Sequence, residues 1–239
     1  MSPLFLLLPA LFLGGVISTI SGGGLGIISI LVGTFFFDIR TNIAVTSLLT
    51  VAIQLVKIAH FHKFIRWDIT KWYVITGVPA SFIGGVLLYY IPERIPEIGM
   101  GIFCILFIIF RLTGFSPKVS TTNTAIATSG AINGFVGGMI GNSSLMRMPV
   151  LLSMGVSKEI FVGTSAMVSF LMNIGKLTAY IPNIPWSKEL GMLLVCAIPV
   201  LLLGVWLGKV LLKYVSSKLF EGLLLCVILF GALRLLFVL

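Results

Sequence analysis

Gln54-Leu55-Val56-Lys57 stands inside a long apolar run of the chain, and a matching phrase, Asn173-Ile174-Gly175-Lys176, stands 119 residues later in another such run. Each phrase has an amide followed three residues later by a lysine, so a helix would place the two groups on one face. A charge inside a membrane span is costly and is usually kept for function. The spacing is about half of the 239-residue chain, which indicates an internal repeat.

The composition is that of an integral membrane protein. The chain is 58% hydrophobic and only 10% charged, whereas soluble domains are about 25% charged. The apolar runs are long and lack the alternation of outer-membrane strands, so the spans are predicted to be helices. Because no polar stretch is long enough to form a soluble domain, we expect residues 1–239 to form a single multi-pass domain of the cell membrane.

Apolar runs of membrane-spanning length recur along the whole chain. The candidate spans are 3–21, 41–62, 70–91, 96–113, 122–140, 159–181, 189–212 and 217–238. Two shorter apolar pieces, 25–37 and 144–154, each follow a glycine-rich break. These runs predict an all-α protein of about eight transmembrane helices in two homologous four-helix repeats, 3–113 and 122–238, whose first helices are broken by glycine.

Further matched positions support the repeat. Pro79 and Gly84 of the first half correspond to Pro199 and Gly204 of the second, and Trp67 corresponds to a tryptophan 119 residues later. An ordered series across both halves indicates two copies of one unit. Basic residues are evenly divided between the two sets of loops, so the sequence leaves parallel and inverted repeats open. Broken segments at matching places point to a transporter's binding site, about which the two halves are expected to rock.

Charged residues restrict the possible functions. The net charge of +9 comes mostly from residues at span ends, where they anchor to headgroups, so no nucleic-acid partner is expected. All seven acidic residues lie at span ends or in loops: Asp38, Asp68, Glu93, Glu97, Glu159, Glu189 and Glu221. This arrangement argues against a buried carboxylate relay or a cation site. The three cysteines lie in apolar runs and the two histidines lie near one span end, so neither a metal nor a cofactor is expected.

An unpaired buried cation is costly, so Lys57 and Lys176 favour an anionic ligand, unless they snorkel to headgroups near the ends of their spans. Arg147 adds a planar fork suited to oxyanions, although an arginine can also anchor at the membrane surface. Helix ends and glycine breaks could add donors from amides, hydroxyls and the backbone. The predicted substrate-binding residues are Lys57, Lys176, Arg147, Gln54, Asn173, Asn142, Ser143, Ser144, Gly23 and Gly24.

Several of these motifs resemble the TauE/SafE sulfite-exporter family, also called the toluene sulfonate uptake permease family. The resemblance rests on the glycine-rich break at 22–26, its copy at 137–149 ending in Met148-Pro149-Val150-Leu151, and Val162-Gly163-Thr164-Ser165-Ala166. It covers nearly the whole chain. One departure is Ile28-Ser29-Ile30-Leu31, where the family often has a proline.

The resemblance implies a permease or exporter of small sulfur-containing anions such as sulfite, sulfonates, sulfoacetate or thiosulfate, bound near the bilayer centre between the two repeats. An anion channel and a non-catalytic membrane subunit are the alternatives. No nucleophile or metal-ligand motif indicates an enzyme. The expected partners are therefore a small anionic substrate and the lipid bilayer, and the sequence does not specify an oligomeric state.

Overall fold

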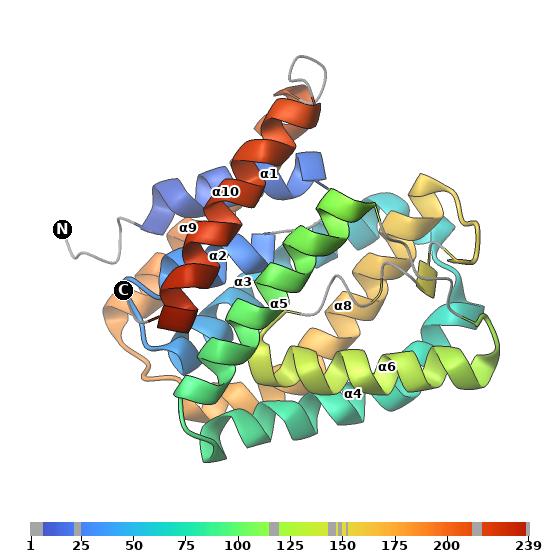
Figure 1. Cartoon of the computed structure of the whole chain (residues 1–239), viewed down its shortest axis with the longest axis horizontal. Helices are drawn as coiled ribbons and strands as arrows, with labels where there is room; N and C mark the ends of the chain where they lie inside the picture. Colours follow the sequence, from blue (N-terminus) through green and yellow to red (C-terminus); the bar gives the residue numbers. More distant parts are fainter. Residues whose placement is uncertain are drawn as a thin grey trace. The chain divides into compact units, whose positions relative to one another are not determined.

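The computed structural model of the chain describes residues 7–21, 25–114, 120–142, 147, 150–151, 153–211 and 217–237. Every regular element in these ranges is a helix, so the all-helical prediction is confirmed for them (Figure 1). The α-helices are α1 (Leu7–Ser21), α2 (Leu25–Gly33), α3 (Ile39–Phe61), α4 (Trp67–Tyr90), α5 (Arg94–Thr113), α6 (Asn123–Ile140), α8 (Lys158–Tyr180), α9 (Lys188–Leu211) and α10 (Ser217–Phe237).

Long apolar stretches account for these helices, because a backbone without water must satisfy its own hydrogen bonds. Within the described ranges, three helical segments are long and apolar enough to cross a membrane: 39–64, 67–90 and 159–183. Pro79 lies inside α4 and Pro199 lies inside α9. Proline is tolerated inside membrane helices because neighbouring groups satisfy the freed carbonyl.

The chain packs as two compact units, each assembled from separate stretches. Unit 1 comprises Met1–Leu49, Glu93–Thr113 and Ile184–Leu239, and unit 2 comprises Thr50–Pro92 and Gly114–Asn183. Helix α3 therefore contributes its first part to unit 1 and its second part to unit 2.

Unit 2 is built on a close contact between α4 and α6, which run side by side (Figure 1). A Cβ added to Gly130, Gly134 or Gly138 of α6 would overlap the carbonyl oxygen of Tyr73, Gly77 or Ser81, respectively. The three glycines are four residues apart, so they form a small-residue stripe that lets the two backbones approach closely. Helix α8 packs on the same α4, where Ser81 Oγ donates to the carbonyl oxygen of Met172 at 3.1 Å.

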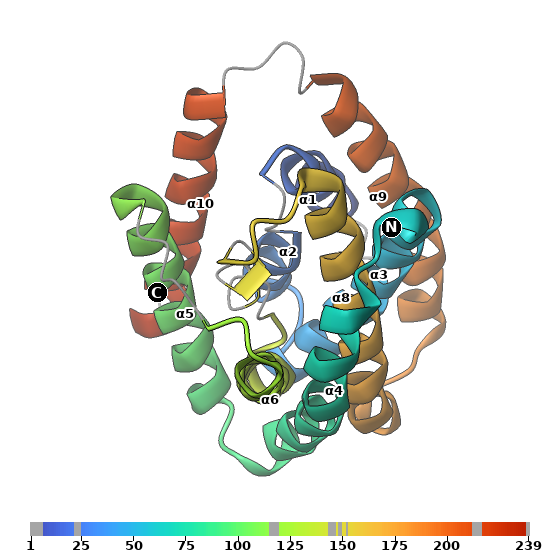
Figure 2. The ribbon, with the colours of Figure 1, turned by 90° about the vertical axis from the view of Figure 1, so that its right-hand side faces the viewer.

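Unit 1 combines α1, α2, α5, α9 and α10 with the start of α3. Helix α1 packs on α9, and α5 packs on α10, the latter pair side by side in Figure 2. Arg94 at the start of α5 donates to the carbonyl oxygen of Leu235 at 2.8 Å. Arg234 of α10 stacks over the ring of Phe35, 3.6 Å from its centroid, and donates to the hydroxyl of Thr34 at 2.5 Å.

One contact has the same form in both units. A Cβ added to Gly84 of α4 would overlap the carbonyl oxygen of Phe135 and lie 3.2 Å from the Cα of Gly138. A Cβ added to Gly204 of α9 would overlap the carbonyl oxygen of Phe12 and lie 3.3 Å from the Cα of Gly15. In each unit a glycine thus packs against a Phe-x-x-Gly turn of the partner helix.

Candidate functional site

The predicted binding residues that the structure describes lie in unit 2. Lys57 and Gln54 belong to the second part of α3, Asn173 and Lys176 to α8, and Arg147 to the short helical segment after α6. Asn142 is half-buried directly after the α6 cap. Four predicted residues lie outside the described ranges: Gly23, Gly24, Ser143 and Ser144.

Arg147 is a buried cation without a partner among the residues that the structure describes. Its side chain is only 7% exposed, and its Nε is buried without a hydrogen bond. No hydrogen bond or ion pair joins its guanidinium to any residue that the structure describes. Breaking a buried ion pair costs about 3–5 kcal/mol because one charge is left uncompensated. An anionic ligand that pairs with Arg147 would therefore offset this cost and stabilise the protein.

The charge of Arg147 acts on Lys57 and on Lys176. Lys57 is half-buried on α3, and within the described ranges its ammonium makes no hydrogen bond or ion pair. Like charges brought together repel each other, more strongly where water is excluded. Lys57 and Arg147 together form an electropositive site that lacks a counter-ion among the described residues.

Lys176 differs from Lys57, although the two lysines match in sequence. Its side chain is 7% exposed, and its Nζ donates to the carbonyl oxygen of Gly141 at 2.7 Å. Gly141 caps α6 in the left-handed conformation, at φ 81°. The C-terminal carbonyls of a helix carry partial negative charge and favour a cation. A helix terminus thus partly neutralises the charge of Lys176.

Two of the predicted amides, buried Asn173 and half-buried Gln54, each have a buried oxygen without a donor among the described residues. Asn173 donates its Nδ2 to the carbonyl oxygen of Ser169 at 2.9 Å, and its Oδ1 has no donor among the described residues. Gln54 likewise has a buried Oε1 without a donor in this part of the chain. The amide nitrogen of Asn173 is thus already bonded to the backbone of its own helix, α8.

Tyr73 was missed by the sequence analysis. It is 1% exposed on α4, its hydroxyl is buried without a partner among the described residues, and the charge of Arg147 acts on it. A buried tyrosine hydroxyl usually finds a partner, as Tyr180 does by donating to the carbonyl oxygen of Gly138. One signal was available: Tyr73 precedes Gly77 by four residues, which places it on the face of α4 that packs against α6.

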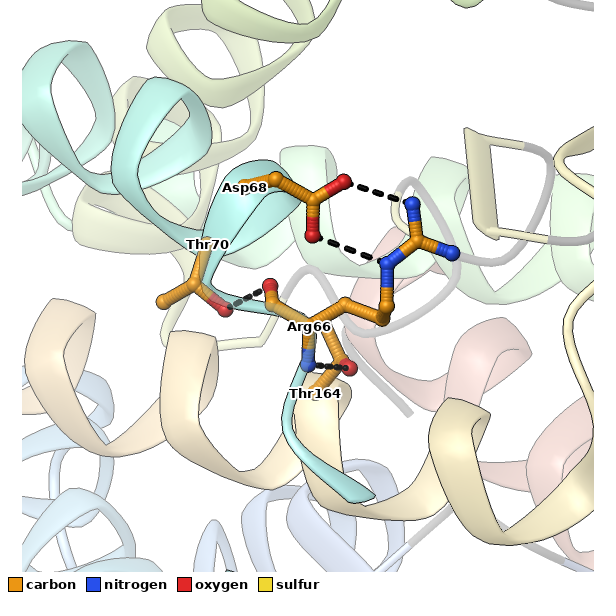
Figure 3. Close-up of polar contacts among 4 residues, drawn as sticks. All are labelled: Arg66, Asp68, Thr70 and Thr164. Atoms are coloured by element: carbon orange, nitrogen blue, oxygen red, sulfur yellow. Dashed lines mark hydrogen bonds and ion pairs between the residues drawn. The ribbon is translucent and has the colours of Figure 1, made fainter. Parts of the chain in front are cut away.

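A polar cavity of 580 Å³ opens at the start of α4. Arg66 donates from Nε to Asp68 Oδ1 at 2.8 Å and from Nη2 to Asp68 Oδ2 at 2.5 Å (Figure 3). This hydrogen bonding raises the pKa of the Arg66 guanidinium. The backbone N–H of Arg66 donates to Thr164 Oγ1 at 3.0 Å, and Thr70 Oγ1 donates to the carbonyl oxygen of Arg66 at 2.9 Å. Arg66 thereby ties α4 to α8 by its backbone while its side chain lines the cavity.

Negative charge is scarce around the buried cations. The buried charged residues in the described ranges are Arg147 and Lys176, and neither is acidic. Asp68, Glu97, Glu159 and Glu189 lie in the first turns of their helices. No group of three or more potential metal ligands occurs in the same ranges. This chemistry accommodates an anion.

Comparison with known protein families identifies the class. The family model described as sulfite exporter TauE/SafE matches residues 7–235. The chain therefore belongs to the TauE/SafE sulfite-exporter family, as its motifs predicted. Searches of curated proteins and of solved structures found no match. Membership implies an integral membrane exporter or permease for sulfite or a related anion.

Proposed function

We propose that this protein carries small sulfur-containing anions, such as sulfite, sulfonates, sulfoacetate or thiosulfate, across the cell membrane, and binds them beside Arg147 in unit 2. The observation that carries the proposal is the buried Arg147 guanidinium without a partner among the described residues. A bound anion supplies the missing counter-charge and forms charge-assisted hydrogen bonds. Family membership supports the same class of substrate.

The shape of the substrate suits these donors. Sulfite and sulfonates present three oxygens around one sulfur, and the planar guanidinium of Arg147 can bind two of them as a fork. The hydroxyl of Tyr73 can donate to the third, and Lys57 supplies a second positive charge. A hydroxyl and a fork placed together favour an oxyanion over a halide of equal charge, because a halide cannot satisfy separated donors.

Lys176 has a different proposed role. Since its ammonium already donates to the carbonyl of Gly141, we assign it to hold the end of α6 next to the segment that carries Arg147. Its charge still adds to the positive potential. Asn142, Ser143 and Ser144 follow the same helix end and remain predicted hydrogen-bond donors, together with Gln54. Gly23 and Gly24 remain predicted points of close backbone approach.

The proposed architecture is about eight membrane spans in two repeats, residues 3–113 and 122–238. The matching contacts of Gly84 and Gly204 support it, because their partner turns, Phe135-x-x-Gly138 and Phe12-x-x-Gly15, also correspond. Gly84 belongs to the first repeat and contacts the second, whereas Gly204 belongs to the second and contacts the first. We infer that each of the two compact units combines helices from both repeats.

Substrate-dependent stabilisation of the purified protein tests the function. A ligand that binds only the folded state raises the melting temperature, and at equal concentration a tighter ligand raises it further. We expect sulfite and methanesulfonate to stabilise the protein more than acetate, and dimethyl sulfone to have no effect because it is neutral. Saturable uptake of sulfite into proteoliposomes completes the test. Equal stabilisation by the neutral sulfone and by sulfite would remove the electrostatic basis of the proposal.

A further inference from the structure

The cavity at the start of α4 is electropositive, and its cationic side chains make only weak contacts with other residues of the protein. Two cations and one carboxylate line it, Arg66, Lys71 and Asp68. The side chains of Arg66 and Asp68 are 46% and 56% exposed, and exposed ion pairs contribute only about 0–1 kcal/mol. Lys71 lies 5.6 Å from the ring centroid of Trp72. Both cations are therefore held weakly enough for an incoming anion to engage them.

Part of the lining of this cavity belongs to a buried apolar cluster that also contains Tyr73. Ile69 and Ile126 line the cavity and also belong to one buried cluster with Tyr73 and Leu151. Tyr73 follows Ile69 by four residues on the same face of α4, a rise of roughly 6 Å along the helix. Ile69, which lines the cavity, is thus one helical turn from Tyr73 along α4.

The segment that carries Arg147 reaches the same cavity. Ser153 and Met154 line the cavity, and Ser153 follows Arg147 by six residues, which span no more than about 20 Å even when extended. Val150 and Leu151, between these positions, are buried in the apolar cluster. Two separate stretches of unit 2, α4 and the segment after α6, therefore contribute residues both to the cavity and to the apolar cluster that contains Tyr73.

From this arrangement we propose that the cavity is the entrance for the sulfur oxyanion, with Arg66 and Lys71 as its first contacts and Ile69 and Ile126 as the barrier before Arg147. The inference rests on the proposed function and adds an outer, lower-affinity anion site to it. Charges at the rim of a site act mainly on association rates. Asp68 limits the positive potential because its carboxylate pairs with Arg66. An incoming anion must therefore compete with Asp68 for Arg66.

An anionic lipid headgroup could supply the same phosphate-like chemistry, since Lys, Arg and Trp are common at membrane interfaces. The charge test is therefore made in vesicles of phosphatidylcholine alone and in vesicles that also contain phosphatidylglycerol. Lys71→Gln should lower, and Asp68→Asn should raise, the initial rate of uptake at low sulfite by roughly two- to fivefold, the range of an exposed ion pair. Lys188→Gln, an equal charge change outside the cavity at the exposed start of α9, is the control.

A steric test complements the charge test. Asn123 is exposed and lines the cavity, so Asn123→Cys is labelled with a bulky neutral thiol reagent in detergent before reconstitution, in a background whose three native cysteines are replaced by alanine. The label should lower uptake by at least roughly tenfold, equivalent to about 1.4 kcal/mol. The same label on Lys188→Cys should leave uptake unchanged.

The outcomes separate this inference from the proposed function. If the parent protein neither binds nor transports a sulfur anion, the proposed function itself fails. If the parent transports sulfite while labelled Asn123→Cys and Lys71→Gln behave like it, the entrance is refuted and the buried site stands. An effect of Lys71→Gln that occurs only with phosphatidylglycerol identifies a lipid site and also overturns the entrance.

Discussion

Removing the hydroxyl of Tyr73 is the most informative single perturbation, because a second buried tyrosine of unit 2, Tyr180, offers a matched control. Tyr73 and Tyr180 are both fully buried. The hydroxyl of Tyr180 donates to the carbonyl oxygen of Gly138, whereas that of Tyr73 has no partner within the described ranges. Tyr73→Phe and Tyr180→Phe therefore make the same chemical change in opposite hydrogen-bonding states.

The expected magnitudes follow from this difference. An unsatisfied buried polar group costs about 1–3 kcal/mol, so Tyr73→Phe should leave the free energy of unfolding unchanged or raise it. If the hydroxyl binds the anion, its loss should cost about 1.5–3 kcal/mol, or roughly ten- to hundredfold in affinity for sulfite. Tyr180→Phe should instead lower stability by about 0.6 kcal/mol and at most about 1.7 kcal/mol, the range for hydrogen bonds between membrane helices.

Two measurements on each purified variant decide the matter: the melting temperature without ligand, and the affinity for sulfite by titration calorimetry. The prediction is a loss of affinity with unchanged or higher stability for Tyr73→Phe, and a loss of stability with unchanged affinity for Tyr180→Phe. The reasoning is refuted if Tyr73→Phe binds sulfite as tightly as the parent, or if the two variants lose stability to the same extent.

Three further predictions concern other parts of the account. Lys57→Met should weaken sulfite binding more than Lys176→Met, because only the Lys176 ammonium already donates to a carbonyl; equal affinities in calorimetry would contradict the assigned roles. Gly134→Ala should lower the melting temperature of the unliganded protein, since its Cβ overlaps the carbonyl oxygen of Gly77, whereas Gly191→Ala, where a Cβ meets nothing within 4 Å, should not. Neutralising the acidic residues singly should leave sulfite uptake in proteoliposomes in every case, and one variant that folds but cannot transport would reveal a carboxylate relay.

The helices could be predicted from the sequence because span length and hydropathy are local properties. The predicted span 96–113 lies within α5, and the predicted span 217–238 begins with α10 at Ser217. The grouping of the helices into two compact units, each built from separate stretches of the chain, could not be predicted in this way. Which helices pack together depends on contacts such as that of Gly84 with Phe135, between residues far apart in the chain.

The candidate site could be predicted in part for the same reason. Lys57, Lys176 and Arg147 stand out because a charge in an apolar run is rare, but their partners are set by tertiary structure. The carbonyl of Gly141 reaches Lys176 only because α6 ends in a left-handed cap. Tyr73 escaped notice because an aromatic residue in an apolar run is usually core packing, and what distinguishes it is a buried hydroxyl without a partner in the described part of the chain.

The central claim is that Arg147 binds the sulfur anion, and titration calorimetry of sulfite into Arg147→Gln and Arg147→Lys tests it most directly. Arg147→Gln removes a buried charge that has no partner among the described residues, and Arg147→Lys keeps the charge on a smaller group. Both variants should therefore fold, and the melting temperature checks this. The account predicts no measurable sulfite binding by Arg147→Gln, and for Arg147→Lys retained but weaker binding with less discrimination between methanesulfonate and acetate, because lysine lacks the fork. Sulfite binding by folded Arg147→Gln with the affinity of the parent would contradict it.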